Sequence, residues 1–193
     1  MKKLPCMLIC FLTVGLVAGA RGGDDPGKMI KYTLDQVITV LRMKDLSADE
    51  KNRRVLEIVT PMFDFSRMAK LTLGRRYWPQ MTEEQQKRFT DLFLKRLKDT
   101  YRDKLVMYTD QKVVYDPVKE IKGKACIPTW RVSGDNRISI IYKLYRPEDQ
   151  WKVYDLEIQG VSLIRSYRSQ FRQILQNGTI DDLLVKLEQP VDS

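Results

Sequence analysis

The sequence of 193 residues contains no histidine, and three of its residues are cysteines. Histidine is the commonest general base of enzymes and the commonest ligand of transition metals, so its absence excludes Ser-His-Asp and Cys-His catalysis. Cys6 and Cys10 lie near the N-terminus and leave Cys126 alone in the rest of the chain. For Cys126 we favour a small buried side chain in a strand over a reactive thiol.

The sequence also lacks the motifs of nucleotide and zinc sites. The complete G-x-x-x-x-G-K-[ST] loop, the G-x-G-x-x-G fingerprint and the paired-cysteine spacing of zinc sites do not occur. Asp155 and Glu157 are two apart in an expected strand and so share one side of it. General acid–base catalysis is one interpretation of this pair, and we favour solvated carboxylates. We expect no catalytic residue, no cofactor, no bound metal and no enzymatic activity.

The first 20 residues have the pattern of a cleaved secretory signal peptide. Met1-Lys2-Lys3 is basic, residues 4–17 are mostly apolar, and Ala18-Gly19-Ala20 matches a cleavage site. The apolar run is too short to span a bilayer comfortably. We therefore divide the chain into a signal peptide (1–20), a flexible leader (21–29), one domain (30–188) and a tail (189–193).

Basic residues outnumber acidic ones, with 34 Lys and Arg against 25 Asp and Glu. This excess suits an anionic partner such as a membrane surface, lipid headgroups or nucleic acid, and solubility alone explains it equally well. Aromatic residues lie beside basic ones in Arg75-Arg76-Tyr77-Trp78, but no dense basic run or stacking motif occurs. Because the signal peptide also directs the chain away from nucleic acid, we expect no nucleic-acid binding.

Hydrophobic periodicity predicts helices, then strands, then helices. Helical spacing begins near Ile30, and capping boxes at Ser47 and Thr82 open two further helices. A helical period returns after Gly160 and again after Gly178. Four strands are expected at residues 112–118, 124–132, 137–145 and 151–158. This order predicts an α+β domain with helices on one face of a curved antiparallel sheet of about four strands.

The helix that follows Thr82 carries the widest apolar stripe of the sequence. Its members recur every four residues and therefore share one face. They are Phe89, Phe93, Leu97, Tyr101 and Leu105. Ordinary core packing and a wall that contacts a ligand both fit this stripe, and spacing alone does not separate them.

Residues 151–172 read WKVYDLEIQGVSLIRSYRSQFR and run from an expected strand directly into an expected helix. Gly160 permits a sharp turn and Ser162 is suited to cap the helix, so we interpret the join as a structural corner. The same segment resembles the signature of the MlaC family, also called the toluene-tolerance family. That signature reads W-K-V-Y-D, then E-G-V-S, then N/R-Y-R-S-Q-F, and Gln159 departs from it where many members have glutamate.

Two further stretches strengthen the resemblance. Residues 68–89, MAKLTLGRRYWPQMTEEQQKRF, are similar to a family segment with Leu-Gly-x-x-Trp followed by T-x-E-Q and a helix. The Phe-Asp-Phe at residues 63–65 also fits. The resemblance covers residues 30–187, which is nearly all of the chain after the signal peptide.

This resemblance implies a periplasmic phospholipid carrier with a cone-like fold similar to nuclear transport factor 2. In such a fold, a curved sheet and helices enclose an apolar pocket for acyl chains. The implied partners are a glycerophospholipid, an inner-membrane ABC transporter complex with its membrane-anchored lipid-binding subunit, and an outer-membrane lipoprotein complex. The chain would shuttle lipid between these complexes as a monomer. The family includes a hopanoid-associated subset, and the alternative function is a cone-fold enzyme or binder that acts on a small hydrophobic or hopanoid-like molecule.

Periodicity and the resemblance together select residues for the lipid pocket. The helices contribute Met68, Leu71, Phe93, Leu97, Tyr101, Ile164, Tyr167 and Phe171. The strands and the corner contribute Ile127, Ile140, Tyr142, Val153, Leu156, Ile158 and Val161. Arginines that would meet a headgroup phosphate, a membrane or an acidic partner are Arg75, Arg76, Arg165, Arg168 and Arg172. A solvated helix face explains these arginines equally well.

Overall fold

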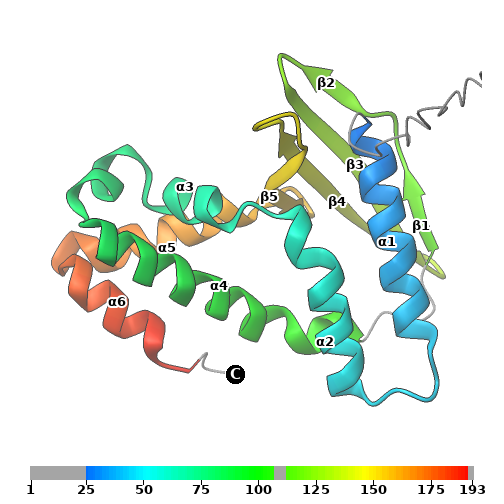
Figure 1. Cartoon of the computed structure of the whole chain (residues 1–193), viewed down its shortest axis with the longest axis horizontal. Coiled ribbons are helices and arrows are strands. Elements are labelled where there is room, and N and C mark those ends of the chain that lie inside the picture. Colours follow the sequence, from blue (N-terminus) through cyan, green and yellow to red (C-terminus); the bar gives the residue numbers. More distant parts are fainter. Residues whose placement is uncertain (1–24, 107–111, 191–193) are drawn as a thin grey trace, which may run out of the picture.

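The computed structural model describes residues 25–106 and 112–190, with an antiparallel sheet at one end of the molecule and a group of helices that extends away from it (Figure 1). The helices before the sheet are α1 (Pro26–Arg42), α2 (Ala48–Val59), α3 (Phe65–Tyr77) and α4 (Glu83–Val106). Short 3-10 helices, η1 (Thr60–Met62) and η2 (Trp78–Gln80), flank α3. After the sheet come α5 (Leu163–Asn177) and α6 (Ile180–Glu188). The predicted α+β class is confirmed.

The sheet has six strands rather than about four. They are β1 (Lys112–Tyr115), β2 (Lys119–Ile121), β3 (Lys124–Ser133), β4 (Asn136–Tyr145), β5 (Lys152–Ile158) and β6 (Val161–Ser162). The strand expected at residues 112–118 ends at Tyr115, shortly before Pro117, which has no N–H to donate to a neighbouring strand. The two strands that were not expected are β2, which follows Pro117, and β6. Strands β1 and β2 pair with opposite ends of β3. The main path runs β1-β3-β4-β5-β6, with every pair antiparallel.

Helix α1 begins earlier than the sequence analysis placed it. Asp25 caps it, because its Oδ1 accepts hydrogen bonds from the amides of Gly27 (2.9 Å) and Lys28 (3.1 Å), and Pro26 occupies the first helical position. Residues 26–29, assigned above to a flexible leader, are therefore helical. The signal peptide and residues 21–24 of the leader lie outside the described residues, as do residues 191–193 of the tail.

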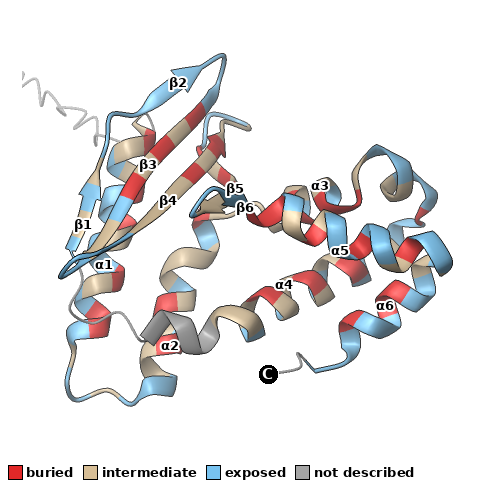
Figure 2. Ribbon diagram, turned by 180° about the vertical axis from the view of Figure 1, so that it is seen from behind, coloured by how far each residue is buried: buried red, intermediate tan, exposed pale blue. Residues whose placement is uncertain are grey.

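Buried apolar side chains form three clusters. The helix cluster lies between α3, α4, α5 and α6, whose buried residues face one another (Figure 2), and it includes Phe89, Phe93 and Phe171. The sheet cluster lies between α1 and one face of the sheet, here called the inner face, and includes Ile30 and Ile127. A third, smaller cluster joins α1 to α2. The helices thus cover the sheet on one side and also build a core of their own.

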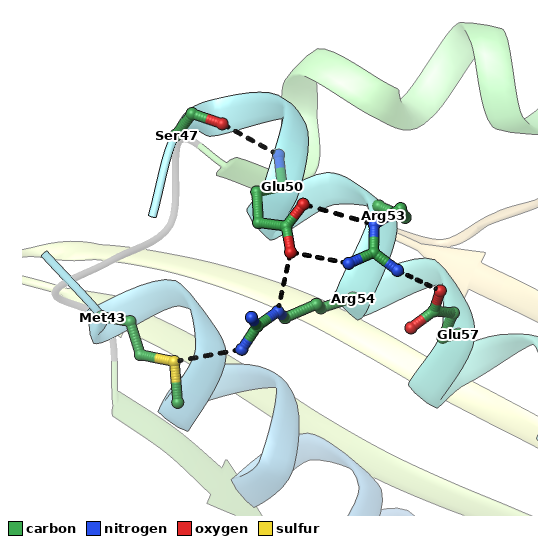
Figure 3. A network of polar contacts seen from close by, with 6 residues as sticks. All are labelled: Met43, Ser47, Glu50, Arg53, Arg54 and Glu57. Carbon is green, nitrogen blue, oxygen red and sulfur yellow. Dashed lines mark hydrogen bonds and ion pairs between the residues drawn. The ribbon is translucent and has the colours of Figure 1, made fainter. Parts of the chain in front are cut away.

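A polar network holds the start of α2 (Figure 3). The Ser47 Oγ accepts a hydrogen bond from the Glu50 amide (3.2 Å). The Glu50 carboxylate accepts from Arg53 (2.6 Å) and Arg54 (3.2 Å), and Arg53 also donates to Glu57 (2.7 Å). The Arg53 hydrogen bond is the main reason that the pKa of Glu50 is lowered. Of the two hydrogen bonds of the expected capping box, the one from the Glu50 amide to the Ser47 hydroxyl forms. The Glu50 side chain binds Arg53 and Arg54 instead of the Ser47 amide.

Helix α3 has a kink at Gly74, where φ is +64°. In a continuous helix the Leu71 carbonyl would accept from the amide four residues later, beyond the kink. Here the guanidinium of Arg168, from α5, donates to that carbonyl through Nε (2.9 Å) and also through Nη2. Arg168, which we considered for headgroup binding, is thus used to fasten α5 to α3.

Replacing Arg168 by alanine is expected to destabilise the domain by about 1.5–3 kcal/mol, because the Leu71 carbonyl loses both hydrogen bonds from the partly buried, charged guanidinium. Arg172→Ala, an exposed position on the same helix, is the matched control and should change stability by no more than about 0.5 kcal/mol. Urea unfolding followed by circular dichroism measures both. Equal effects of the two variants would contradict the fastening role of Arg168.

Candidate functional site

The corner between β5 and α5 is built around the buried side chain of Asp155, which is 5% exposed. Its carboxylate accepts hydrogen bonds from the Ser162 hydroxyl (2.7 Å) and from the Ile164 amide (3.1 Å). The Ser162 Oγ in turn accepts from the Arg165 amide (3.2 Å) and caps α5. Gly160 makes the turn with a φ of +78°. The predicted structural corner is confirmed, whereas a solvated carboxylate at Asp155 is wrong.

Cations neutralise both acids of the corner. The Lys143 Nζ lies 3.4 Å from Asp155 and 2.7 Å from Glu157, and Arg165 lies 3.6 Å from Glu157. The hydrogen bond from Lys143 lowers the pKa of Glu157. A general acid needs a carboxyl group that stays protonated near neutral pH, which is the opposite shift. The arrangement is therefore that of a structural ion-pair network.

The pocket residues chosen from helices all lie in or against the helix cluster. Six are buried there: Met68, Phe93, Leu97, Ile164, Tyr167 and Phe171. Leu71 and Tyr101 are partly buried against them. The ring of Phe93 packs edge-on against those of Tyr167 (5.2 Å between centroids) and Phe171 (6.3 Å). Most of the α4 stripe is thus core, and the side chain of Leu105 lies outside the described residues.

The pocket residues chosen from strands share the inner face of the sheet. Ile127 pairs with Tyr142, which pairs with Leu156, and Ile140 pairs with Ile158. Val153 lies three residues before Leu156, a spacing that places side chains on opposite faces of a regular strand. A register shift between β4 and β5 at Lys143/Leu144 lets both occupy the inner face. Ile127, Tyr142 and Val153 are buried, whereas Ile140, Leu156 and Ile158 are half-buried.

Two half-buried side chains, Leu156 and Phe63, pack against both the helix cluster and the sheet cluster. We call the line along which these clusters meet the seam. Backbone contacts join the start of α3 to β5 beside the seam. The Asp64 amide donates to the Val153 carbonyl (2.9 Å), and Phe63 forms a parallel bridge with Val153. The seam brings helix-derived and strand-derived pocket residues into one apolar surface.

Val161 is the pocket residue that the structure does not bring to the others. Its side chain is 61% exposed, while the next residue, Ser162, is 2% exposed. The two residues form β6, so their side chains point to opposite sides. Because Ser162 must point inward to reach Asp155, Val161 points to solvent.

Burial along the inner face of β4 falls steadily toward the β3–β4 turn. Leu144 is 0% exposed and Tyr142 is 7% exposed, whereas Ile140 and Ile138 are half-buried. Burial raises the pKa of Tyr142 and brings that of Tyr115, which lies on β1 beyond β3, to about 12. Tyr142 is buried and Tyr115 is half-buried. One end of the inner face of β4 is thus buried, and the other end is more exposed.

Two cavities lie at opposite ends of β4. One, of about 450 Å³, lies between the start of α3 and the β4–β5 turn and is lined by Phe63, Asp64, Phe65, Ser66, Tyr145, Pro147, Glu148, Gln150 and Lys152. The other, of about 280 Å³, lies at the β3–β4 turn and is lined by Arg131, Ser133, Asn136, Arg137, Ile138 and Gln159. Neither is lined by the predicted lipid residues, so the expected apolar pocket is neither of these two cavities.

The arginines chosen from sequence do not line these cavities. Arg75, Arg76, Arg165 and Arg172 are exposed on α3 and α5. The sequence analysis overlooked Arg131 and Arg137, which flank the Ser-Gly-Asp-Asn turn at residues 133–136. The available signal was that both lie within two residues of a predicted hairpin turn.

Within residues 25–106 and 112–190, no helix is long and apolar enough to cross a membrane. Across the same ranges, Cys, Asp and Glu side chains form no group of three or more that is arranged to hold a metal ion.

These features define an α+β protein whose helical layer meets the inner face of an antiparallel sheet along an apolar seam. Among solved structures, the phospholipid-binding protein from Ralstonia solanacearum, determined in complex with a phospholipid, is similar to this chain. The TM-score is 0.76 and the sequences are 27% identical, over 85% of this chain and 95% of the other.

The MlaC protein family model matches residues 31–189, and the chain belongs to that family. The toluene tolerance protein ttg2D of Pseudomonas putida is 28% identical over 126 residues, which is 64% of this chain and 59% of that protein. The intermembrane phospholipid transport system binding protein MlaC of Haemophilus influenzae is 26% identical over 200 residues, covering 98% of this chain and 93% of that protein. The family resemblance is confirmed, and the hopanoid-associated subset stays a prediction.

Proposed function

We propose that this chain is a periplasmic phospholipid carrier and that it catalyses no reaction. The seam is the observation that carries the proposal, because Leu156 and Phe63 contact both apolar clusters yet stay half-buried. The phospholipid in the Ralstonia structure and the transport role named for the Haemophilus relative support the same function. The neutralised acids of the corner speak against an enzyme that uses them.

The physical problem for a carrier is the cost of moving acyl chains through water. Each buried methylene group is worth about 0.8 kcal/mol, so two chains of about 16 carbons amount to roughly 25 kcal/mol. A protein surface of similar polarity to the bilayer interior offsets most of this cost. The helix and sheet clusters supply such a surface, and we infer that acyl chains lie between them along the seam and the half-buried part of the inner face.

The carrier needs partners that deliver and accept lipid. We propose that it exchanges glycerophospholipid with an inner-membrane ABC transporter complex, through that complex's membrane-anchored lipid-binding subunit, and with an outer-membrane lipoprotein complex. Transfer from bilayer to protein is nearly balanced in free energy, because the acyl chains have apolar surroundings in both. Direction would therefore come from the ATP-driven partner, since the sequence has no nucleotide-binding motif of the P-loop or dinucleotide type.

Native mass spectrometry of the chain purified from the periplasm, without added lipid, tests this function. We expect one diacyl phospholipid per monomeric chain, because the seam of a single chain supplies both apolar surfaces. A hopanoid adduct would identify the other ligand class by its mass. A chain without adduct that converts a small hydrophobic substrate would overturn the carrier in favour of the enzyme alternative.

A further inference from the structure

The cavity of about 280 Å³ at the β3–β4 turn, here called the arginine cavity, combines two cations with neutral polar groups. Arg131 and Arg137 line it together with Ser133, Asn136 and Gln159. None of its six lining residues is acidic, and Ile138 is its apolar member. Arginine guanidinium groups, hydroxyls and amides are the donors that proteins use to bind phosphate oxygens.

The arginine cavity meets the open end of the inner face through Arg131 and Ile138, whereas Arg137 pairs with Val132 and lies on the other face of β4. In the β3–β4 register, Arg131 pairs with Ile138, and four residues away Ile127 pairs with Tyr142. Residues four apart on a strand lie on one face, about 13 Å apart at 3.3 Å per residue. A molecule lying along β4 would thus pass from the buried Tyr142 to the guanidinium of Arg131 within that distance. The strip of the inner face from Tyr142 to Arg131 is apolar at one end and cationic at the other, which matches the polarity of a phospholipid.

The charge of Arg131 reaches the inner face. Burial raises the pKa of Tyr142, the neighbouring Tyr115 adds to that rise, and the positive charge of Arg131 acts in the opposite direction. The β3–β4 register places Arg131 on the same face of β3 as Ile127, the partner of Tyr142. The same positive potential would attract an anionic group at the end of the strip.

The wall of the cavity opposite β3 is fixed by backbone contacts. The Gln159 amide donates to the Ser139 carbonyl (2.9 Å), and its side-chain Oε1 accepts from the Ser139 amide (3.3 Å). Its Nε2 also donates to the Arg137 carbonyl (3.5 Å). These contacts hold the end of β5 against β4, so the cavity is shaped before a ligand arrives.

We propose that the arginine cavity binds the phosphate group of the lipid, with the acyl chains running along the inner face toward the seam. This assignment rests on the proposed carrier function and adds a site to it. Ser133, Asn136 and Arg137 are exposed, so the rest of the headgroup stays in water. Recognition at this site would depend on the phosphate, which glycerophospholipids share, rather than on the alcohol attached to it.

The test compares two soluble ligands with the same acyl chains, dihexanoyl phosphatidylglycerol and dihexanoylglycerol, by calorimetry on the delipidated full chain. The double variant Arg131→Gln/Arg137→Gln should bind the phospholipid at least tenfold more weakly and dihexanoylglycerol within twofold of the parent chain. The charge-matched control Arg75→Gln/Arg76→Gln, exposed on α3, should bind both ligands like the parent. Arg137→Gln alone, on an exposed side chain, should give a smaller loss and keeps the test independent of any folding defect.

The outcomes separate the site from the function. Unchanged phospholipid binding by the double variant, or an equal loss for both ligands, would overturn the phosphate site while leaving the carrier intact. A parent chain that binds neither ligand would overturn the carrier itself. Inorganic phosphate is the third probe: saturation as tight as with phosphatidylglycerol would assign the cavity to free phosphate, and we expect much weaker binding.

Discussion

Replacing Ile140 by glutamate is expected to remove co-purified phospholipid from a chain that still folds. Ile140 is half-buried on the inner face of β4, between the buried Tyr142 and the arginine cavity. A carboxylate there would lie against acyl chains, and burying it without a partner costs several kcal/mol. Because the native side chain is only half-buried, the unliganded protein can leave the new charge in water. Lipid per chain, measured by native mass spectrometry, should fall at least tenfold.

Ile141→Glu is the control that separates a lost site from a damaged sheet. Ile141 is the next residue of the same strand, is also half-buried, and points to the outer face, where it pairs with Glu157. Lys143 and Arg165 lie beside Glu157 and limit repulsion between the two acids. Lipid content should stay near that of the parent chain. Equal losses in the two variants would place the acyl chains somewhere other than the inner face.

Replacing Asp155 by alanine is expected to cause the largest loss of stability, about 3–5 kcal/mol. Its carboxylate is buried and accepts from Ser162 and from the Ile164 amide, so the substitution leaves two buried donors without an acceptor. It also removes one of the two acids that face Lys143. The free energy of unfolding, from urea titration followed by circular dichroism, measures the effect.

The matched control for Asp155 is Glu157→Ala, two residues away on the same side of β5. The half-buried Glu157 carboxylate contacts Lys143 and the exposed Arg165 and accepts no hydrogen bond from α5 among the described residues, so its loss should cost less than that of Asp155, about 1 kcal/mol. A difference between the variants of less than about 1 kcal/mol would show that the corner does not depend on Asp155.

Local sequence signals predicted the helices well, because each depends on residues close together in the chain. Thr82 and Gln85 form the full reciprocal capping box expected at the start of α4, with bonds of 3.1 and 3.0 Å. Gly74 interrupts α3, although the helix resumes beyond it. The sheet has more strands than expected because two short strands, β2 and β6, are defined by their pairing with β3 and β5, which alternation within one segment does not show.

The candidate site was harder to predict for the same reason. Alternation gives the face of a side chain within one strand, but the register shift at Lys143/Leu144 depends on how two strands meet. The burial of Asp155 likewise depends on α5 folding back onto β5, where Ser162 and Ile164 meet it. Spacing could show which residues share a stripe, and only packing shows which stripes meet at the seam.

The kink in α3 and the corner between β5 and α5 together make α5 a link between the sheet and the helical layer. Asp155 ties the first turn of α5 to β5, and Arg168, about one turn further on, ties the same helix to α3. A force applied to the exposed side of α5 is therefore transmitted to the sheet at one point and to the helical layer at another. A partner that contacts this helix would therefore act on both the sheet and α3 without touching the lipid site that we propose.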